Sequence, residues 1–377
     1  MDFEFSEDQE ALRDAVRRWV DGDYSFEQRR AIVREGGFSR AAWEGLAGLG
    51  LMGLAVPEAQ GGLGFGPVEA MVVMEELGRG IVLEPYAQTG LIAPAVLAHA
   101  PAPVQAQWLP LIAGGEALVV LAHQERGARY ALNKIDCRFE GGRLSGTKSL
   151  VPAGDAADAF IVPARSSEGI VLCLATEATE ATEANGATGA TRRGYSLQDG
   201  SRAAEIVFNA SPAELLVGPG QGLAVLEQAA DVGIAALCAE AVGVMDRLVQ
   251  LTAEYLNTRK QFGVTIASFQ ALRHRIADVK MQLELARSMS YYATLKLQAP
   301  PPQRRRALAQ AKLQLGQSMR FVGQQCTQLH GGIGVTDEYI GSHYFKRLTV
   351  MEMQWGDSLH HLGEVSSRME DTAGVFA

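Results

Sequence analysis

The sequence predicts an α+β fold with an N-terminal α-helical domain, a middle β-domain and a C-terminal four-helix-bundle domain. Three observations favour this order: helical spacing of apolar residues comes first, short alternating apolar runs follow, and long helical stretches broken by proline complete the chain. We place the domains at residues 1–117, 118–222 and 223–377. A chain of 377 residues is long enough for two or three compact units.

The N-terminal part has the pattern of helices joined by short loops. Ser6 and Gln9 form a capping-box pattern at the start of the first helix. Further helices are predicted over Ala41–Leu51 and Pro67–Leu77. The glycine-rich segment Gln60–Gly64 lies between helices and does not follow a strand, so we interpret it as a connecting loop and not as a phosphate-binding loop.

The middle part shows the shorter period of strands. Alternating residues lead to Gly141-Gly142, which is a hairpin turn signal. The segment Thr176–Thr191 consists mostly of Ala, Thr, Glu and Gly, so we predict a mobile surface loop there. Strands are predicted over Leu118–Ala122, Ala159–Pro163, Ile170–Leu174 and Ala204–Phe208.

Helical periodicity returns at Leu223 and continues for most of the remaining chain. The proline run in Ala299–Pro302 separates two of the long helices. Long helices joined by short breaks favour a bundle. They are predicted over Ala224–Tyr255, Phe269–Gln298 and Gln303–Leu329.

Bulk composition excludes several classes of function. The net charge of −9 argues against general binding to nucleic acid or to anionic membranes. Apolar runs are too short to insert in a membrane, and no basic-then-apolar leader precedes the first helix. The four cysteines lack CxxC spacing, which favours buried thiols and a cytoplasmic location. His360 and His361 are adjacent and lack companion ligands at suitable spacing, so no metal site is predicted.

Two segments of the C-terminal part form a recognisable pair. The first is Arg259–Gly263, followed by Phe269-Gln270, and the second is Gln328–Gly334, followed by Glu338-Tyr339. In order and separation they resemble the C-terminal signatures of the acyl-CoA dehydrogenase family. The helix–strand–helix plan agrees with that family over essentially the full length. The resemblance is to the small-subunit type of bacterial pimeloyl-CoA and sterol acyl-CoA dehydrogenases.

This resemblance implies FAD as cofactor and a shared FAD site at a subunit interface. An arginine can hold pyrophosphate oxygens with two N–H groups, glutamine amides can donate and accept, and glycines let backbone N–H groups approach a ligand. Without the family pattern, Arg259 would complement a helix dipole, Phe262 would pack in the core and Gly263 would end a helix. The residues expected to bind FAD are Arg259, Gln261, Phe262, Gln328, Gly331 and Gly332.

The catalytic base of the family is missing from both of its usual places. Family members remove the α-proton with a carboxylate while the β-hydride passes to the flavin. The usual Glu-Gly dipeptide is Trp355-Gly356 here, and Gly233 stands at the alternative position. Asp357 is the nearest substitute, because desolvation beside an acyl chain would raise its pKa toward a useful range.

Asp357 also has a simpler interpretation as the cap of a helix that begins near Ser358. Two other carboxylates are more remote candidates for the base. Glu240 lies about two helical turns, roughly 10 Å, beyond the alternative position, which makes it a poor geometric replacement. Glu352 is the other.

The β-domain departs from the family as well. The loop that meets flavin and thioester corresponds to Gln124–Tyr130, where only Glu125 and a glycine remain. The flavin strand corresponds to Lys148–Pro152 and lacks its tryptophan. We interpret His123 as a surface or core histidine rather than as an active-site donor.

Three functions follow from these features. The leading one is FAD-dependent α,β-dehydrogenation of an acyl-CoA thioester in fatty acid or sterol catabolism, with electron-transferring flavoprotein as the expected electron acceptor. The second is an FAD-binding subunit whose base lies on a partner chain. The third is a non-catalytic structural paralogue. The assembly is expected to be a homo-oligomer or a heterotetramer with a second acyl-CoA dehydrogenase subunit.

Overall fold

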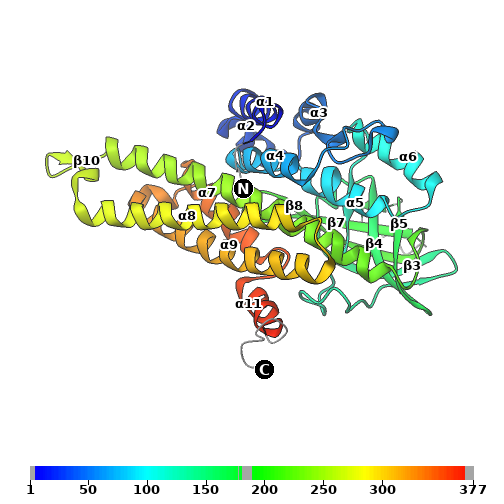
Figure 1. Cartoon of the computed structure of the whole chain (residues 1–377). Coiled ribbons are helices and arrows are strands. Elements are labelled where there is room, and N and C mark those ends of the chain that lie inside the picture. The colour runs from blue at the N-terminus through cyan, green and yellow to red at the C-terminus, as the bar shows by residue number, and fades with distance from the viewer. Residues whose placement is uncertain (1–4, 177, 181–188, 370–377) are drawn as a thin grey trace. The chain divides into compact units, whose positions relative to one another are not determined.

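The computed structural model describes residues 5–176, 178–180 and 189–369. The chain divides into two compact units, each assembled from separate stretches of sequence. The first unit contains Met1–Phe26, Met71–Val82 and Ile234–Ala377, and the second contains Glu27–Ala70 and Leu83–Gly233. Helices, then strands, then helices follow one another along the chain as predicted (Figure 1). The α+β fold is therefore confirmed, while the three domain boundaries stay a prediction.

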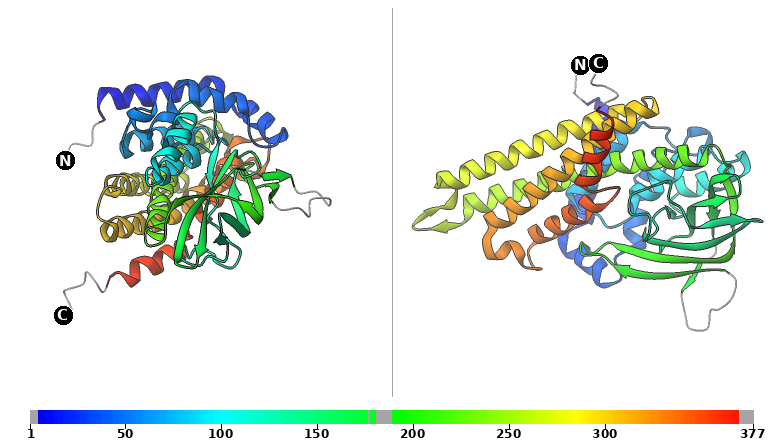
Figure 2. Two further views of the ribbon diagram at one scale, coloured as in Figure 1. Left: turned by 90° about the vertical axis from the view of Figure 1, so that its right-hand side faces the viewer. Right: turned by 90° about the horizontal axis from the view of Figure 1, so that it is seen from below.

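The first unit is helical, and Figure 2 shows its long helices α8 and α9 side by side. The first helix, α1, begins with the predicted capping box, in which Gln9 N–H donates to Ser6 Oγ and Ser6 N–H donates to Gln9 Oε1. The helices of this unit are α1 (Glu7–Asp23), most of α4 (Pro67–Arg79), α7 (Gly222–Thr258) from Ile234 onward, α8 (Gln270–Lys296), α9 (Pro301–His330), α10 (Ile340–Met353) and α11 (Ser358–Ser367).

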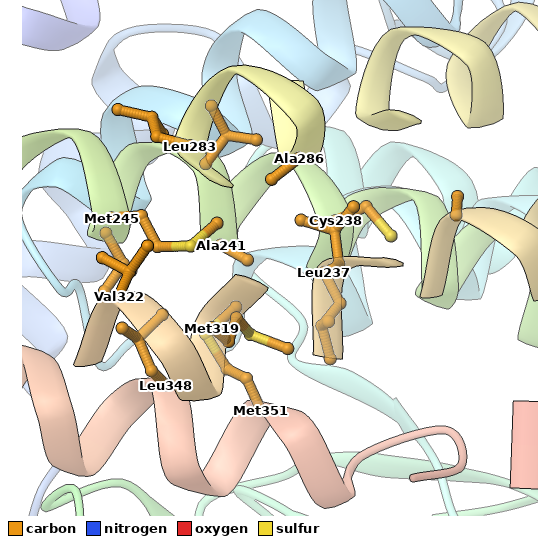
Figure 3. Packing of buried hydrophobic residues seen from close by; sticks show 14 of the residues in the cluster. Leu237, Cys238, Ala241, Met245, Leu283, Ala286, Met319, Val322, Leu348 and Met351 are labelled. Carbon is orange, nitrogen blue, oxygen red and sulfur yellow. The ribbon is translucent and has the colours of Figure 1, made fainter. Parts of the chain in front are cut away.

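Four of these helices, α7 to α10, share one apolar core. Figure 3 shows side chains from all four converging on it. Small residues such as Ala241 and Ala286 let the helices approach closely, while Leu and Met side chains fill the space between them. Each fully buried leucine or methionine contributes about 1.5–3 kcal/mol. This core makes α7 to α10 the predicted four-helix bundle.

The second unit combines helices with a nine-stranded sheet of order β6-β7-β8-β3-β2-β4-β5-β9, in which β1 pairs with β4. Its helices are α2 (Phe26–Arg34) from Glu27 onward, α3 (Arg40–Gly48), α5 (Ala93–Leu97) and α6 (Ala102–Ala113), with a π-helix at Ala87–Ile92. The strands are β1 (Val119–Leu121), β2 (Arg138–Glu140), β3 (Arg143–Pro152), β4 (Ala159–Ser166), β5 (Gly169–Ala175), β6 (Ala178–Glu180), β7 (Gly189–Ser196), β8 (Arg202–Pro212) and β9 (Glu214–Val217).

The hairpin signal is confirmed and the loop prediction is partly wrong. Gly141 and Gly142 connect β2 to β3 with φ of 55° and 75°, the left-handed values that a two-residue hairpin turn requires. The predicted loop Thr176–Thr191 instead contains β6 and the first residues of β7. These strands lie at one end of the sheet, where backbone pairing does not need an apolar sequence. Residues 181–188 of that prediction lie outside the described residues.

Candidate functional site

The two signature segments meet at one end of the helical bundle. Helix α7 ends at Thr258 and leads into the short hairpin of β10 (Lys260–Gln261) and β11 (Val264–Thr265), at the tip beyond α7 and α8 in Figure 1. Helix α9 ends at His330, whose ring lies 4.8 Å from the ring of Tyr255 in the last turns of α7. This contact brings the Arg259 and Gly331 segments to the same end of the bundle.

His330 anchors the turn that follows it. Its Nδ1 lies 2.8 Å from the carbonyl oxygen of Cys326, and its Nε2 lies 2.9 Å from the hydroxyl of Tyr339. Burial lowers the pKa of His330, which favours the neutral ring. Because the Cys326 carbonyl can only accept, Nδ1–H donates to it, and Nε2 accepts the Tyr339 proton. The imidazole therefore ties α9 to the segment beyond the glycine turn.

The glycine turn presents open backbone. Gly331 has φ 65° and ψ −140°, a conformation that essentially only glycine adopts. A Cβ built on Gly331 or Gly332 would meet no atom within 4 Å, and both residues are exposed. The side chain of Gln328 is exposed beside them. The Gly331 N–H donates to the carbonyl oxygen of Gln328, so the exposed Gln328 amide and the uncrowded Gly332 backbone are the groups left to meet a ligand. Both can approach the polar part of a dinucleotide, so this end of the bundle fits FAD.

At the tip of the β10–β11 hairpin, Phe262 does not pack in the core and Gly263 does not end a helix. Phe262 is 91% exposed and has a φ of 53°, so it does not pack in the core. Gly263 has a φ of 79° and forms the turn between β10 and β11, whereas α7 already ends at Thr258. Arg259 and Gln261 are also exposed. An exposed phenylalanine beside an exposed arginine is a typical contact surface for a ligand or another chain.

The turn between α10 and α11 holds Trp355-Gly356, the dipeptide that we predict to stand in place of the family's Glu-Gly. Trp355 is partly buried there and has a φ of 58°, and Gly356 follows with a φ of 107°. Asp357 is the N-cap of α11, because its Oδ1 accepts the His360 N–H at 2.8 Å. The interpretation of Asp357 as a helix cap is therefore confirmed, and its role as a base stays a prediction.

The two remote candidates for the base have structural partners. Glu240 is buried, and its Oε1 accepts from both Nε and a terminal nitrogen of Arg347 at 2.6 Å. Glu352 Oε1 accepts from the backbone N–H of Ser358 at 3.0 Å and from its hydroxyl at 2.8 Å. Both carboxylates hold the bundle together, which argues against a catalytic role for either.

In the sheet unit, Glu125 of the predicted flavin loop is buried in an ion pair. Glu125 Oε1 accepts from Lys148 Nζ at 2.6 Å, and its carboxylate also accepts the N–H groups of Asp136 and Cys137. His123 is partly exposed, and burial of its ring lowers its pKa to about 4. Leu150, within the segment predicted to correspond to the flavin strand, is 44% exposed. Sequence reasoning named Glu125 and Lys148 but missed that they pair.

Comparisons with known proteins agree with this arrangement. A family model described as "Acyl-CoA dehydrogenase, N-terminal domain" matches residues 6–116, and one described as "Acyl-CoA dehydrogenase, C-terminal domain" matches residues 220–369. Acyl-CoA dehydrogenase IpdE2 of Mycobacterium tuberculosis is 31% identical over 320 residues, covering 85% of this chain and 83% of the relative. The chain belongs to the acyl-CoA dehydrogenase family. Acyl-CoA dehydrogenase FadE27 of M. tuberculosis is 29% identical to this chain, and the alignment covers 99% of this chain and 100% of the relative.

Solved structures show the same fold over nearly the whole chain. The ChsE4-ChsE5 complex from M. tuberculosis matches with a TM-score of 0.88 and 26% identity, covering 99% of this chain and 100% of the matched chain. Butyryl-CoA dehydrogenase from Megasphaera elsdenii matches with a TM-score of 0.86 and 21% identity, covering 98% and 100%. This acyl-CoA dehydrogenase is an FAD-dependent oxidoreductase that acts on acyl-CoA thioesters. In the part of the chain that the structure describes, none of the helices contains an apolar stretch of the length that a membrane span requires.

Replacing Arg259 by alanine is expected to weaken FAD binding by roughly 1.5–3 kcal/mol, or about 10- to 100-fold, because a charge-assisted contact is lost. FAD affinity is measured by fluorescence titration of the apoprotein. Lys260→Ala is the matched control, since it removes a neighbouring exposed positive charge from the same hairpin. Equal FAD affinity in the wild type and a folded Arg259→Ala variant would count against this assignment.

Proposed function

We propose that this chain is the FAD-binding subunit of a heteromeric acyl-CoA dehydrogenase whose catalytic base lies on a partner chain. The observation that carries the proposal is the indole of Trp355 at the position where the family has its glutamate. An indole cannot accept the α-proton of a thioester. The carboxylates considered as substitutes, at positions 240, 352 and 357, all accept hydrogen bonds from neighbouring groups in the bundle.

Exposed apolar residues support an assembly of several chains. Phe262 stands at the tip of the β10–β11 hairpin, and a stripe at helical spacing remains exposed on α8. Monomers rarely expose apolar residues in such rows. A second acyl-CoA dehydrogenase subunit is the partner we propose, and the match to a chain of the ChsE4-ChsE5 complex supports this choice. The exposed residues of the stripe are Met281, Leu285, Tyr292 and Leu295.

In this assembly, the residues of this chain bind and position, and the partner transfers the proton. Arg259 and Gln261 would hold the phosphate and ribose part of the cofactor, and Gln328 with the Gly331-Gly332 turn would complete that site at a subunit interface. Bound FAD supplies the acceptor for the β-hydride. A carboxylate of the partner would remove the α-proton, and electron-transferring flavoprotein would then receive the electrons.

A second candidate is an enzyme that uses Asp357 as its own base. Asp357 favours this function because it lies only two residues beyond Trp355 and is not fully buried. Desolvation by a bound acyl chain would raise its pKa toward the range of a general base. In that case the chain would work as a homo-oligomer without a different partner.

Flavin bleaching by acyl-CoA separates these functions. We expect that the purified chain, loaded with FAD, does not bleach with butyryl-CoA, octanoyl-CoA or a steroid side-chain CoA thioester. Bleaching should appear after a second acyl-CoA dehydrogenase subunit that carries the family's glutamate is added. Purification of a well-folded chain that takes up no FAD would instead favour the non-catalytic paralogue.

Asp357→Asn is the decisive variant when the chain bleaches alone. Asparagine caps a helix as well as aspartate does, so the fold should be unchanged. If Asp357 is the base, bleaching should slow by at least about 100-fold. If the wild type bleaches alone and Asp357→Asn is equally fast, both the partner base and the Asp357 base are wrong.

A further inference from the structure

The turn between α10 and α11 is held in a shape that its own sequence does not favour. It comprises residues 354–357, and both Trp355 and Gly356 have positive φ values, of 58° and 107°. A bulky residue such as tryptophan seldom adopts the left-handed region. Such a conformation persists only when the surrounding structure imposes it. The groups that surround this turn therefore determine where the side chain at position 355 lies.

The first of these groups is the ammonium of Lys312, in the middle of α9. Its side chain is completely buried, and Nζ donates to the carbonyl oxygens of Glu352 at 2.9 Å and Gly356 at 2.8 Å. The Glu352 carbonyl belongs to α10 and the Gly356 carbonyl belongs to the turn, so the Lys312 ammonium links the end of α10 to the turn. Among the described residues, no carboxylate forms an ion pair with Lys312. Burial lowers the pKa of Lys312 to about 8, while the charges of Glu352 and Asp357 raise it. The negative end of α10 and the carbonyl of the turn also favour the ammonium.

The second group is His361 in α11. Its Nε2 lies 2.9 Å from the carbonyl oxygen of Trp355, and the residue is buried. Burial and the nearby charge of Lys312 lower the pKa of His361 to about 3, so the ring is neutral and Nε2–H is the donor. The carbonyls of Trp355 and Gly356 thus each receive a buried donor from a different helix.

We propose that Lys312 and His361 are positioning residues that lock this turn and fix the side chain at position 355 at the place of the missing base. Lys312, His361 and the turn of residues 354–357 then form a frame that could hold a catalytic base. In this subunit the frame holds the indole of Trp355, which cannot accept the α-proton. This inference rests on the proposed function, because only a chain without its own base can gain one at this position. A carboxylate introduced at position 355 would be held by the same frame.

The frame itself is tested by hydrogen exchange of the peptide that spans residues 352–361. Lys312→Met keeps the apolar length of the side chain but removes both hydrogen bonds. We expect the amides of this peptide to exchange at least tenfold faster in Lys312→Met, while FAD content and helical circular dichroism are retained. Lys280→Met is the matched control, since Lys280 lies on the exposed surface of α8. Equal exchange in Lys312→Met and Lys280→Met would overturn the positioning role, and Lys312→Gln should give an intermediate rate because it keeps a donor.

The position of the side chain is tested by Trp355→Glu. The FAD-loaded variant alone should bleach at least tenfold faster than the matched Trp355→Gln variant with the three acyl-CoA thioesters named above. Adding Lys312→Met to Trp355→Glu should abolish this gain. If Trp355→Glu is no faster than Trp355→Gln, position 355 does not face the reacting carbon and the inference is wrong. Bleaching by the wild type alone would instead count against the proposed function, and the exchange experiment would still report on the frame.

Discussion

Replacement of Glu125 by glutamine is expected to lower the free energy of unfolding by about 3–5 kcal/mol, although the two side chains have nearly the same shape. The carboxylate of Glu125 lies 2.6 Å from the ammonium of Lys148, whose side chain is fully buried. The neutral amide would leave this ammonium buried without an opposite charge. The NH₂ group of glutamine would also face the N–H of Asp136 or Cys137, where the wild type has an acceptor.

Chemical denaturation of the FAD-loaded protein measures this loss. The matched control is Arg126→Ala, which removes the neighbouring ion pair between Arg126 and Glu205. The Arg126 side chain is 80% exposed, so its removal should cost less than about 1 kcal/mol. In the double variant Glu125→Gln/Lys148→Met, no buried charge is left unpaired, and part of the lost stability should return. A loss in Glu125→Gln as small as in Arg126→Ala would contradict a buried, stabilising pair.

Local sequence patterns predicted those parts of the molecule that depend on near neighbours. The capping box at Ser6 and the turn at Gly141-Gly142 involve residues only a few positions apart, and both are confirmed. The long helices of the bundle follow from their apolar periodicity and from the proline break. Their ends differ by a few residues; for example, α9 already begins at Pro301, because proline is favourable in the first helical turn.

The parts that sequence did not reveal depend on residues far apart in the chain. Lys312 is separated by 40 residues from Glu352 and by 44 from Gly356, and a lone lysine in a helical pattern gives no sign of either hydrogen bond. The contact between Tyr255 and His330 joins residues that are even farther apart in the sequence. The two signature segments were recognised as a pair only through the family resemblance, and their meeting at one end of the bundle needed the three-dimensional fold.

The last prediction concerns the glycine turn at that end. Gly331→Ala should lower the stability of the chain by about 1–3 kcal/mol, because alanine does not tolerate φ 65° with ψ −140°. If the backbone relaxes instead, the turn that carries Gln328 and Gly332 moves, and FAD affinity should fall as well. Denaturation and FAD titration are both measured, since the first reports on strain and the second on the cofactor site.

The variant Gly332→Ala distinguishes an effect of backbone strain from an effect on how closely FAD can approach the turn. Gly332 does not have a positive φ, and its Cβ would meet no atom of this chain within 4 Å, so the variant should be as stable as the wild type. If the cofactor approaches this backbone closely, the added methyl group should nevertheless reduce FAD affinity. Loss of affinity without loss of stability in Gly332→Ala would therefore place FAD against the turn. If both alanine variants keep full FAD affinity, the turn is only the end of α9, and Gly331 and Gly332 have no part in the cofactor site.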